Sequence, residues 1–189
     1  MSGIPEGLSV EKTGIDGLFR VRLQVHGDSR GWFKESYQRA KMTELGLPEF
    51  EIVQNNVSYN EQAGVVRGIH AEPWEKFISP AHGRVFAAIV DLREGDGFGR
   101  LETFELGVGD AIFVPRGCGN SYLALEPQTV YSYLVNEHWR PGITYPAVDL
   151  FDETLAIDWP MSREQMTVSE KDSRNPPLSQ VQPVPRTAS

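Results

Sequence analysis

The chain has 189 residues, of which 40% are apolar and 23% are charged, and this composition indicates a single globular domain and excludes a disordered chain. The formal net charge of −8 argues against a nucleic-acid-binding protein that works through a basic surface. The single cysteine, Cys118, excludes an intrachain disulfide and favours a reducing cytoplasm, and the longest apolar run, residues 85–90, is far too short to span a membrane.

Short segments with apolar residues at every second position follow one another between Gly and Pro residues. The first expected strand covers residues 18–26, and a helix is expected over residues 37–45, ended by Gly46. The further expected strands, in chain order, cover residues 50–57, 65–70, 84–92, 101–106, 111–114, 121–125 and 130–135. A short turn or helix is expected around residues 162–172.

Eight short strands with few helices predict an all-β fold, either a sandwich or a small barrel. Such a barrel leaves a mouth that can hold one small ligand, so the site is expected among polar residues on inward strand faces. We expect the domain to cover residues 1–174. Residues 175–189 are rich in proline and lack apolar periodicity, which predicts a mobile tail or a linker.

The histidines show no spacing typical of a metal site, and the one cysteine has no CxxC partner. His70 is the best candidate among them, because it shares an otherwise apolar strand with Arg67, where two costly polar groups need partners or a purpose. His82 lies in a Pro-Ala-His-Gly stretch that is typical of a turn, and His26 is placed at a strand end.

Two further polar clusters stand out. Gln54, Asn55 and Asn56 are poor strand formers, and they fit either a bulge or edge strand or a polar ligand pocket. The run alone does not decide between the two. Upstream, Arg30 follows an expected turn and stands near Trp32, an arrangement that could bind an anion beside an aromatic face.

Seven short motifs, each weak alone, follow one another along most of the chain. They are DSRGWFKE (28–35), VQNNVS (53–58), GVVRGIH (64–70), VDLREG (90–95) with Phe98-Gly99, FVPRG (113–117), AIDWP (156–160) and SEKD (169–172). In this order and at this spacing they resemble the dTDP-4-dehydrorhamnose 3,5-epimerases, a cupin family, over residues 14–178.

The resemblance implies a cupin-type jelly-roll sandwich or barrel, a homodimer, and no need for a metal or an organic cofactor. It also implies the reaction, which is inversion of C3 and C5 in a nucleotide-linked 4-keto-6-deoxyhexose on the way to L-rhamnose. The nucleotide sugar is then the partner, and neither nucleic acid nor a membrane is expected. The proline-rich end would suit a linker to the reductase that completes rhamnose synthesis.

The resemblance also assigns catalytic roles. His70 matches the base, and Asp172 matches the carboxylate that fixes the tautomer of its ring. Tyr133 matches the general acid, and strand alternation places Tyr131 on the same face. Lys76 would stabilise the oxyanion that develops on O4 of the sugar.

The remaining matched positions bind substrate. Arg30 and Arg67 match residues that grip the nucleotide diphosphate, for which the planar guanidinium is well suited. The positions matched to hydrogen bonding of the nucleotide and to an aromatic contact with the sugar are Glu35, Gln54, Asn56 and Trp139.

Three positions depart from the family pattern. The loop between His70 and Lys76 is shorter than in the common version of the family. A family histidine is replaced by Asn120, which can bind substrate by a hydrogen bond but carries no charge. A core aspartate is replaced by Ala87, which removes a partner for the lysine or the histidine. We interpret these changes as a subfamily signature, compatible with an altered substrate or with inversion at one carbon.

Other functions fit parts of this pattern. A single-carbon epimerase or a 3,4-ketoisomerase would use the same scaffold, and product stereochemistry would separate them from the double epimerase. A non-catalytic sugar-nucleotide sensor would keep Arg30 and Arg67 but would have no use for His70, Asp172 and Tyr133. A metal oxygenase is the weakest alternative, because the ligand spacing is absent.

Overall fold

The structure is a computed structural model that describes residues 4–186. Within this range the strands are β1 (Ser9–Lys12), β2 (Phe19–Arg22), β3 (Val25–Asp28), β4 (Gly31–Lys34), β5 (Gln54–Asn60), β6 (Val66–His70), β7 (Lys76–His82), β8 (Val85–Asp91), β9 (Leu101–Leu106), β10 (Asp110–Val114), β11 (Cys118–Ala124) and β12 (Thr129–Val135). The helix α1 covers Arg39–Glu44, and short 3-10 helices cover Arg163–Gln165, Asp172–Arg174 and Leu178–Gln180. The chain is therefore all-β with a few short helices, as the sequence predicts.

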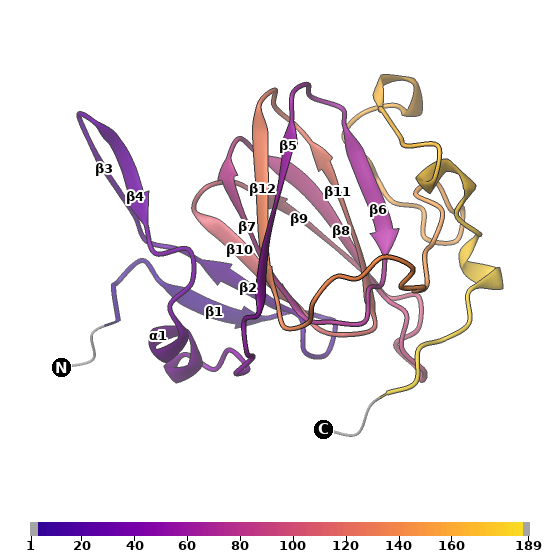
Figure 1. Ribbon diagram of the computed structural model, residues 1–189, viewed down its shortest axis with the longest axis horizontal. Coiled ribbons are helices and arrows are strands. Elements are labelled where there is room, and N and C mark those ends of the chain that lie inside the picture. The colour runs from indigo at the N-terminus through magenta and orange to yellow at the C-terminus, as the bar shows by residue number, and fades with distance from the viewer. Residues whose placement is uncertain (1–3, 187–189) are drawn as a thin grey trace.

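Two antiparallel sheets lie face to face and form a sandwich (Figure 1). The larger sheet has the strand order β1-β2-β10-β7-β12-β5, and the smaller has the order β6-β11-β8-β9. Ile78 and Ile112 of the larger sheet pack against Val85 and Ile89 of the smaller one, all fully buried. This interlayer core closes one part of the sandwich and leaves a cavity in another.

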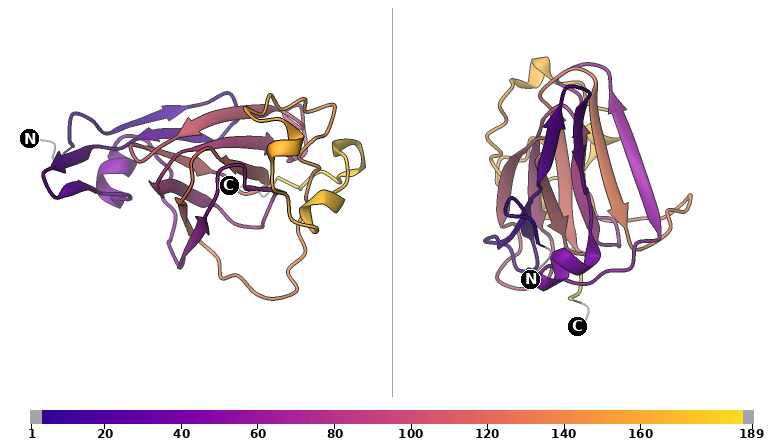
Figure 2. Two further views of the ribbon diagram at one scale, coloured as in Figure 1. Left: turned by 90° about the horizontal axis from the view of Figure 1, so that it is seen from above. Right: turned by 90° about the vertical axis from the view of Figure 1, so that its left-hand side faces the viewer.

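The outer face of each sheet is also covered. Helix α1 lies over the larger sheet, where Met42 packs with Phe77 and Phe113, and its position confirms the helix expected at residues 37–45. The chain from residue 148 onward lies over the smaller sheet (Figure 2), where Val148 and Leu150 pack on its strands. Both sheets are thus covered over part of their outer faces, whereas the edge strand β5 exposes Val57 and Tyr59.

Strand β7 was not predicted, and the turn expected around His82 is wrong in that His82 ends this strand. Pro80 explains the error, because a proline cannot donate to a sheet ladder and argues against a central strand. The strand tolerates it because pairing with β10 ends at Ile78. On the other side, the register with β12 shifts immediately after Pro80.

The strand expected over residues 18–26 is divided in the structure. β2 pairs within the larger sheet as far as Arg22. From Val25 the chain leaves that sheet, and β3 pairs only with β4 in a separate two-stranded hairpin. The strand β1, which pairs with β2, was not expected at all.

The β3–β4 hairpin projects from the body of the sandwich (Figures 1 and 2) and exposes Trp32 and Phe33. Lys34 fixes its base, since the Nζ atom donates to Ser79 Oγ at 2.6 Å and to the carbonyl oxygens of Pro80 and Val108 at 2.8 Å. Burial lowers the pKa of Lys34 to about 8, against the opposing effect of nearby Asp110. The base of the hairpin is therefore held against the larger sheet by these hydrogen bonds.

Residues 175–186 lie against the domain, whereas the proline-rich sequence predicts a mobile tail or linker from residue 175. Leu178 and Val181 are buried, and the backbone N–H of Val184 donates to the carbonyl of Leu92 at 2.7 Å. These three apolar side chains are separated by proline and polar residues at irregular spacing, so no helix or strand period reveals them.

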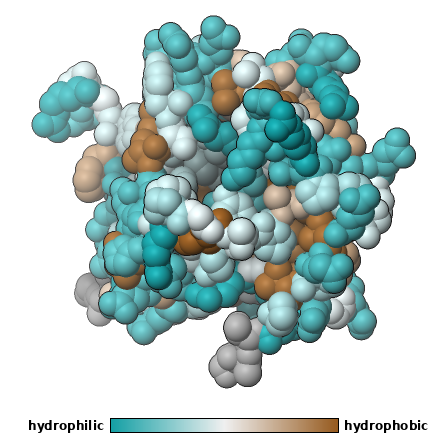
Figure 3. All heavy atoms as spheres, turned by 45° about the vertical axis from the view of Figure 1, so that its right-hand side comes forward, coloured by the Kyte–Doolittle hydropathy of each residue, from teal (hydrophilic) through white to brown (hydrophobic). Residues whose placement is uncertain are grey.

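Seen from the side that carries this C-terminal segment, the surface is mainly hydrophilic, with small separated apolar areas (Figure 3). No helix within residues 4–186 is long and apolar enough to cross a membrane.

Candidate active site

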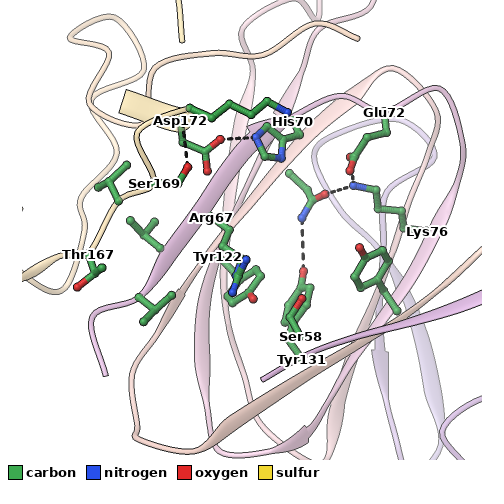
Figure 4. A pocket seen from close by; sticks show the side chains of 16 residues that line it. Ser58, Arg67, His70, Glu72, Lys76, Tyr122, Tyr131, Thr167, Ser169 and Asp172 are labelled. Atoms are coloured by element: carbon green, nitrogen blue, oxygen red, sulfur yellow. Dashed lines mark hydrogen bonds and ion pairs between the residues drawn. The ribbon is translucent and has the colours of Figure 1, made fainter. Parts of the chain in front are cut away.

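A cavity of about 480 Å³ opens between the two sheets, in the size range of small-molecule sites. It is lined by strands of both sheets and by the segment around Asp172 (Figure 4). The residues predicted from the sequence that line it are Arg67, His70, Lys76, Asn120, Tyr133 and Asp172. Residues spread over more than a hundred positions of the chain therefore meet in one cavity.

A bulge in β6 lets Arg67 and His70 face the same cavity, although strict alternation would place them on opposite faces. His70 pairs with Asn120 of β11 and Arg67 pairs with Tyr122, so two residues of β6 lie opposite one residue of β11. One of the two is Gly68, at φ +122°, where an added Cβ atom would lie 2.5 Å from the Cβ of Ser121. The close contact requires glycine there.

His70 and Asp172 form a hydrogen-bonded pair, with 2.7 Å between Nε2 and Oδ1 (Figure 4). Burial acts to raise the pKa of Asp172, but the hydrogen bond and charge of His70, together with Gly68 N–H and Ser169, lower it below its ordinary value. Asp172 is thus a carboxylate that can only accept, so Nε2 of His70 carries a proton and Nδ1 is left to take one.

Tyr133 lines the cavity from the other sheet, on β12. Burial, and after it the negative charge of Glu72, raises the pKa of Tyr133 to about 12. The phenol therefore holds its proton at neutral pH and can donate it. Tyr131, two residues earlier, lines the same cavity, which confirms the shared face.

Lys76 lies at the start of β7, and its side chain is only 6% exposed. Its Nζ atom donates to the Glu72 carboxylate and to Asn120 Oδ1, and it lies 5.9 Å from the ring centre of Tyr133. The shorter loop after His70 therefore still delivers the lysine to the cavity.

Three predicted binding residues form a group beside the cavity. Gln54 and Asn56 lie on the same face of β5 as Ser58, which lines the cavity, and Asn56 pairs with Tyr133. Gln54 Nε2 donates to Asn56 Oδ1 at 2.6 Å, and Gln54 Oε1 accepts from the backbone N–H of Trp139 at 3.1 Å. β5 ends the larger sheet, so the amide run lies on an edge strand, and its interpretation as part of a ligand pocket stays a prediction.

Arg30 and Glu35 do not line the cavity. Arg30 lies in the turn of the β3–β4 hairpin, where its exposed side chain pairs with Asp28. Glu35 follows the hairpin and pairs with Lys41 of α1 at 2.6 Å. Within one chain, these two residues are separate from the site.

The structure adds cavity residues that sequence reasoning did not select. Tyr122 stacks on Tyr131 with 3.8 Å between ring centres, and Glu72 binds Lys76. Lys171 also lines the cavity, and its Nζ donates to the hydroxyl of Tyr145 at 3.3 Å. Lys171 lies in the same short motif as Asp172, which was the one signal available for it.

No group of three or more His, Cys, Asp or Glu side chains that could hold a metal ion is found among residues 4–186. The cavity instead offers a histidine–carboxylate pair on one wall and a protonated tyrosine on the other. In a cupin-type β-sandwich, this arrangement defines an isomerase that moves protons by acid–base catalysis.

Comparison with known proteins identifies the family. Residues 12–180 match the family model described as dTDP-4-dehydrorhamnose 3,5-epimerase, and this chain belongs to that family. It is 44% identical over 177 residues to a protein named RmlC homolog from Streptococcus pyogenes, covering 90% of this chain and 89% of that protein. It is 32% identical over 174 residues to the dTDP-4-dehydrorhamnose 3,5-epimerase of Methanothermobacter thermautotrophicus, covering 88% and 92% of the two chains.

Two solved structures with RmlC in their descriptions have the same fold as this chain. RmlC from Streptococcus suis, in complex with dTDP-D-xylose, superposes with a TM-score of 0.91 at 41% identity, over 97% of both chains. RmlC from Legionella pneumophila, in complex with dTDP-4-keto-L-rhamnose, gives a TM-score of 0.85 at 28% identity and covers 96% of this chain and 100% of that one.

Proposed function

We propose that this chain inverts C3 and C5 of dTDP-4-dehydro-6-deoxyglucose to give dTDP-4-dehydro-L-rhamnose, in the biosynthesis of L-rhamnose. The observation that carries the proposal is the placement of His70 and Tyr133 on opposite walls of one cavity. Inversion at a carbon needs a proton to leave from one face and another to arrive at the opposite face.

The chemistry follows from the C4 ketone, which acidifies the protons on C3 and C5. Nδ1 of His70 removes such a proton, and Asp172 stabilises the imidazolium that forms. The electrons of the broken C–H bond move to O4, where the Lys76 ammonium stabilises the enolate. Tyr133 returns a proton to carbon from the other side.

The nucleotide diphosphate requires cations at the cavity. Arg67 supplies one, held by Asn60 Oδ1, which accepts from its Nε at 3.5 Å. Lys171 supplies another from the cavity rim. Gln54, Asn56 and Trp139 extend the site along β5, where they would contact the nucleotide and the sugar.

A dimer would let Arg30 and Glu35 serve this reaction. They lie at the hairpin and outside the cavity of their own chain, and the hairpin exposes Trp32 and Phe33. We therefore propose a homodimer in which the hairpin of one subunit reaches the cavity of the other, and brings its arginine to the diphosphate there.

The direct test is hydrogen exchange. In heavy water, incubation of dTDP-4-dehydro-6-deoxyglucose with the protein should raise the mass of the sugar by two units, one from each exchanged carbon. His70→Ala should lower the exchange rate by about 10²–10⁴-fold, the usual contribution of a general base. Retained binding of dTDP and an unchanged melting temperature are the controls, and a near-wild-type rate would rule out this role of His70.

A single-carbon epimerase remains the second candidate function. The structure also superposes, with a TM-score of 0.81 at 25% identity, on ChmJ, a protein described as a 3'-monoepimerase from Streptomyces bikiniensis. A mass increase of one unit instead of two, with product stereochemistry determined by NMR, would favour this function.

Two broader expectations accompany the proposal. The product still carries a ketone at C4, so a reductase must act after this protein to give rhamnose. Cys118, the only cysteine, is buried and unpaired, which supports a reducing cytoplasm as the location.

A further inference from the structure

Glu72 is a cavity carboxylate whose one effect described above is to add to the raised pKa of Tyr133, after burial. It lies in the bend between β6 and β7, two residues after His70, and its side chain is only 13% exposed. A carboxylate this far removed from water needs a strong partner. Among the described residues its ion-pair partner is Lys76, the residue placed at the developing oxyanion.

Glu72 and Asn120 together fix the direction of the Lys76 ammonium. Both accept hydrogen bonds from Nζ, one through a carboxylate oxygen and one through an amide oxygen (Figure 4). An ammonium has three N–H groups, so a single N–H remains for a ligand. Because lysine ends in a point charge on a flexible stem, these two acceptors decide where the remaining N–H points.

The neutral acceptor is itself held in place. Asn120 Nδ2 donates to the hydroxyl of Tyr131 at 3.4 Å, and the Tyr131 ring stacks on Tyr122. Tyr122 in turn donates to Asn60 Oδ1 at 3.2 Å. The ammonium is therefore anchored on one side by a fixed polar network, and on the other by the charge of Glu72 alone.

We propose that Glu72 is a positioning residue, which holds the Lys76 ammonium against Asn120 so that its third N–H meets O4 of the substrate. Glu72 acts through Lys76 and does not touch the substrate. A charge-assisted hydrogen bond is about twice as strong as a neutral one. A carboxylate can therefore hold the ammonium where a neutral amide holds it only weakly. This inference rests on the function proposed above.

A double-mutant cycle tests it. Glu72→Gln keeps the shape and removes the charge, and we expect kcat to fall about 10-fold with KM unchanged, because the lost interaction belongs to the transition state. Lys76→Met should lower kcat by about 10²–10³-fold, as for loss of one oxyanion donor. In the Lys76→Met background, Glu72→Gln should have no further effect, because burial, the larger cause of the raised Tyr133 pKa, still keeps that phenol protonated at neutral pH.

Glu75→Gln is the matched control. Glu75 lies in the same bend, but its Oε2 accepts from Asn136 Nδ2 at 2.8 Å and it does not line the cavity. We expect wild-type kcat from this variant. Should Glu72→Gln fail to fold, as judged by its melting temperature, Glu72→Asp replaces it in the cycle. Its effect on kcat should likewise disappear in the Lys76→Met background.

The outcomes separate this inference from the proposed function. Wild-type kcat in Glu72→Gln overturns the positioning role while leaving the epimerase function intact. An equal loss of kcat in the presence and absence of Lys76 also overturns it, because the effect then does not pass through the lysine. If the wild-type protein binds dTDP but exchanges no sugar hydrogen, the proposed function fails and this inference fails with it.

Discussion

At the scale of single residues, the imidazole of His70 is held from two directions. Asp172 binds Nε2, and Tyr145 meets the ring edge to face with 5.7 Å between ring centres. A ring held in this way presents one nitrogen in a constant direction, which proton transfer requires. The pair also lowers the pKa of Asp172, and the site therefore contributes to the pH dependence of the protein's stability.

The pKa of Asp172 predicts a pH dependence. It lies below the ordinary value of 3.8, so as the pH falls the unfolded chain takes up the proton before the native chain does. The stabilisation is therefore complete above that value and is lost as the pH falls toward the native pKa. Relative to Asp172→Asn, we expect the wild type to be more stable by about 1–2 kcal/mol at pH 6.

The measurement is urea unfolding of both proteins at several pH values. The difference in free energy of unfolding should shrink as the pH falls below 3.8, the ordinary pKa of an aspartate. Taking the difference between the two proteins cancels the contribution of the other carboxyl groups to the pH dependence of unfolding. A difference that stays constant or grows as the pH falls below 3.8 would contradict the lowered pKa of Asp172.

The chemistry of these residues was only partly visible in the sequence. His70 stood out, because a histidine and an arginine on an apolar strand need an explanation. Asp172 did not, because nothing in its local sequence distinguishes it from a solvated turn residue, and only the family motif selected it. Glu72 was missed for the same reason: a glutamate in a loop shows no sign that its partner is a buried lysine.

At the scale of secondary-structure elements, the bulge in β6 controls the site. Gly68→Ala would bring a methyl group against Ser121 and the carbonyl oxygen of Asn120, at a positive φ that alanine rarely adopts. We expect a loss of more than about 1 kcal/mol in stability, and a large loss in exchange rate, because Arg67 and His70 must move.

Gly46→Ala is the control for this variant. Gly46 also has a positive φ, at +97°, but an added Cβ atom there meets nothing within 4 Å. Gly46→Ala should therefore lose stability, because its backbone is strained, but should keep the wild-type exchange rate. Equal rates in the two variants, measured by sugar deuteration, would show that the bulge does not position the site.

The elements were easier to predict from the sequence than their pairings were. Alternation located most strands and the stop signal at Gly46 marked the end of the helix α1, since both depend on local pattern. It failed at β7, where the proline is tolerated by a register shift that only the neighbouring strands reveal. It also failed after residue 174, where apolar side chains without a period pack on the smaller sheet. Both errors concern tertiary contacts.

At the scale of the whole molecule, the projecting hairpin predicts sharing between subunits. Arg30→Ala and His70→Ala proteins should each be nearly inactive alone. If the hairpin serves the neighbouring cavity, a mixed dimer contains one complete site, formed by His70 of one subunit and Arg30 of the other. Mixing after partial denaturation and refolding should therefore restore exchange activity.

Refolding each variant alone is the control for this experiment, and size-exclusion chromatography checks that the mixture is dimeric. If dimers form but activity does not return, Arg30 does not act across the interface. A substrate-binding role for Arg30 would then require its hairpin to fold back onto its own cavity.

The site is divided between two layers: the histidine belongs to the smaller sheet and the tyrosine to the larger. The gap between proton acceptor and proton donor is thus set by the thickness of the sandwich, and so by side chains such as Ile78 and Ile89 that separate the sheets. Replacing Ile78 or Ile89 by a smaller residue would therefore change the turnover rate, although all the reacting side chains would still be present. The apolar core between the sheets therefore sets the distance between the base and the acid.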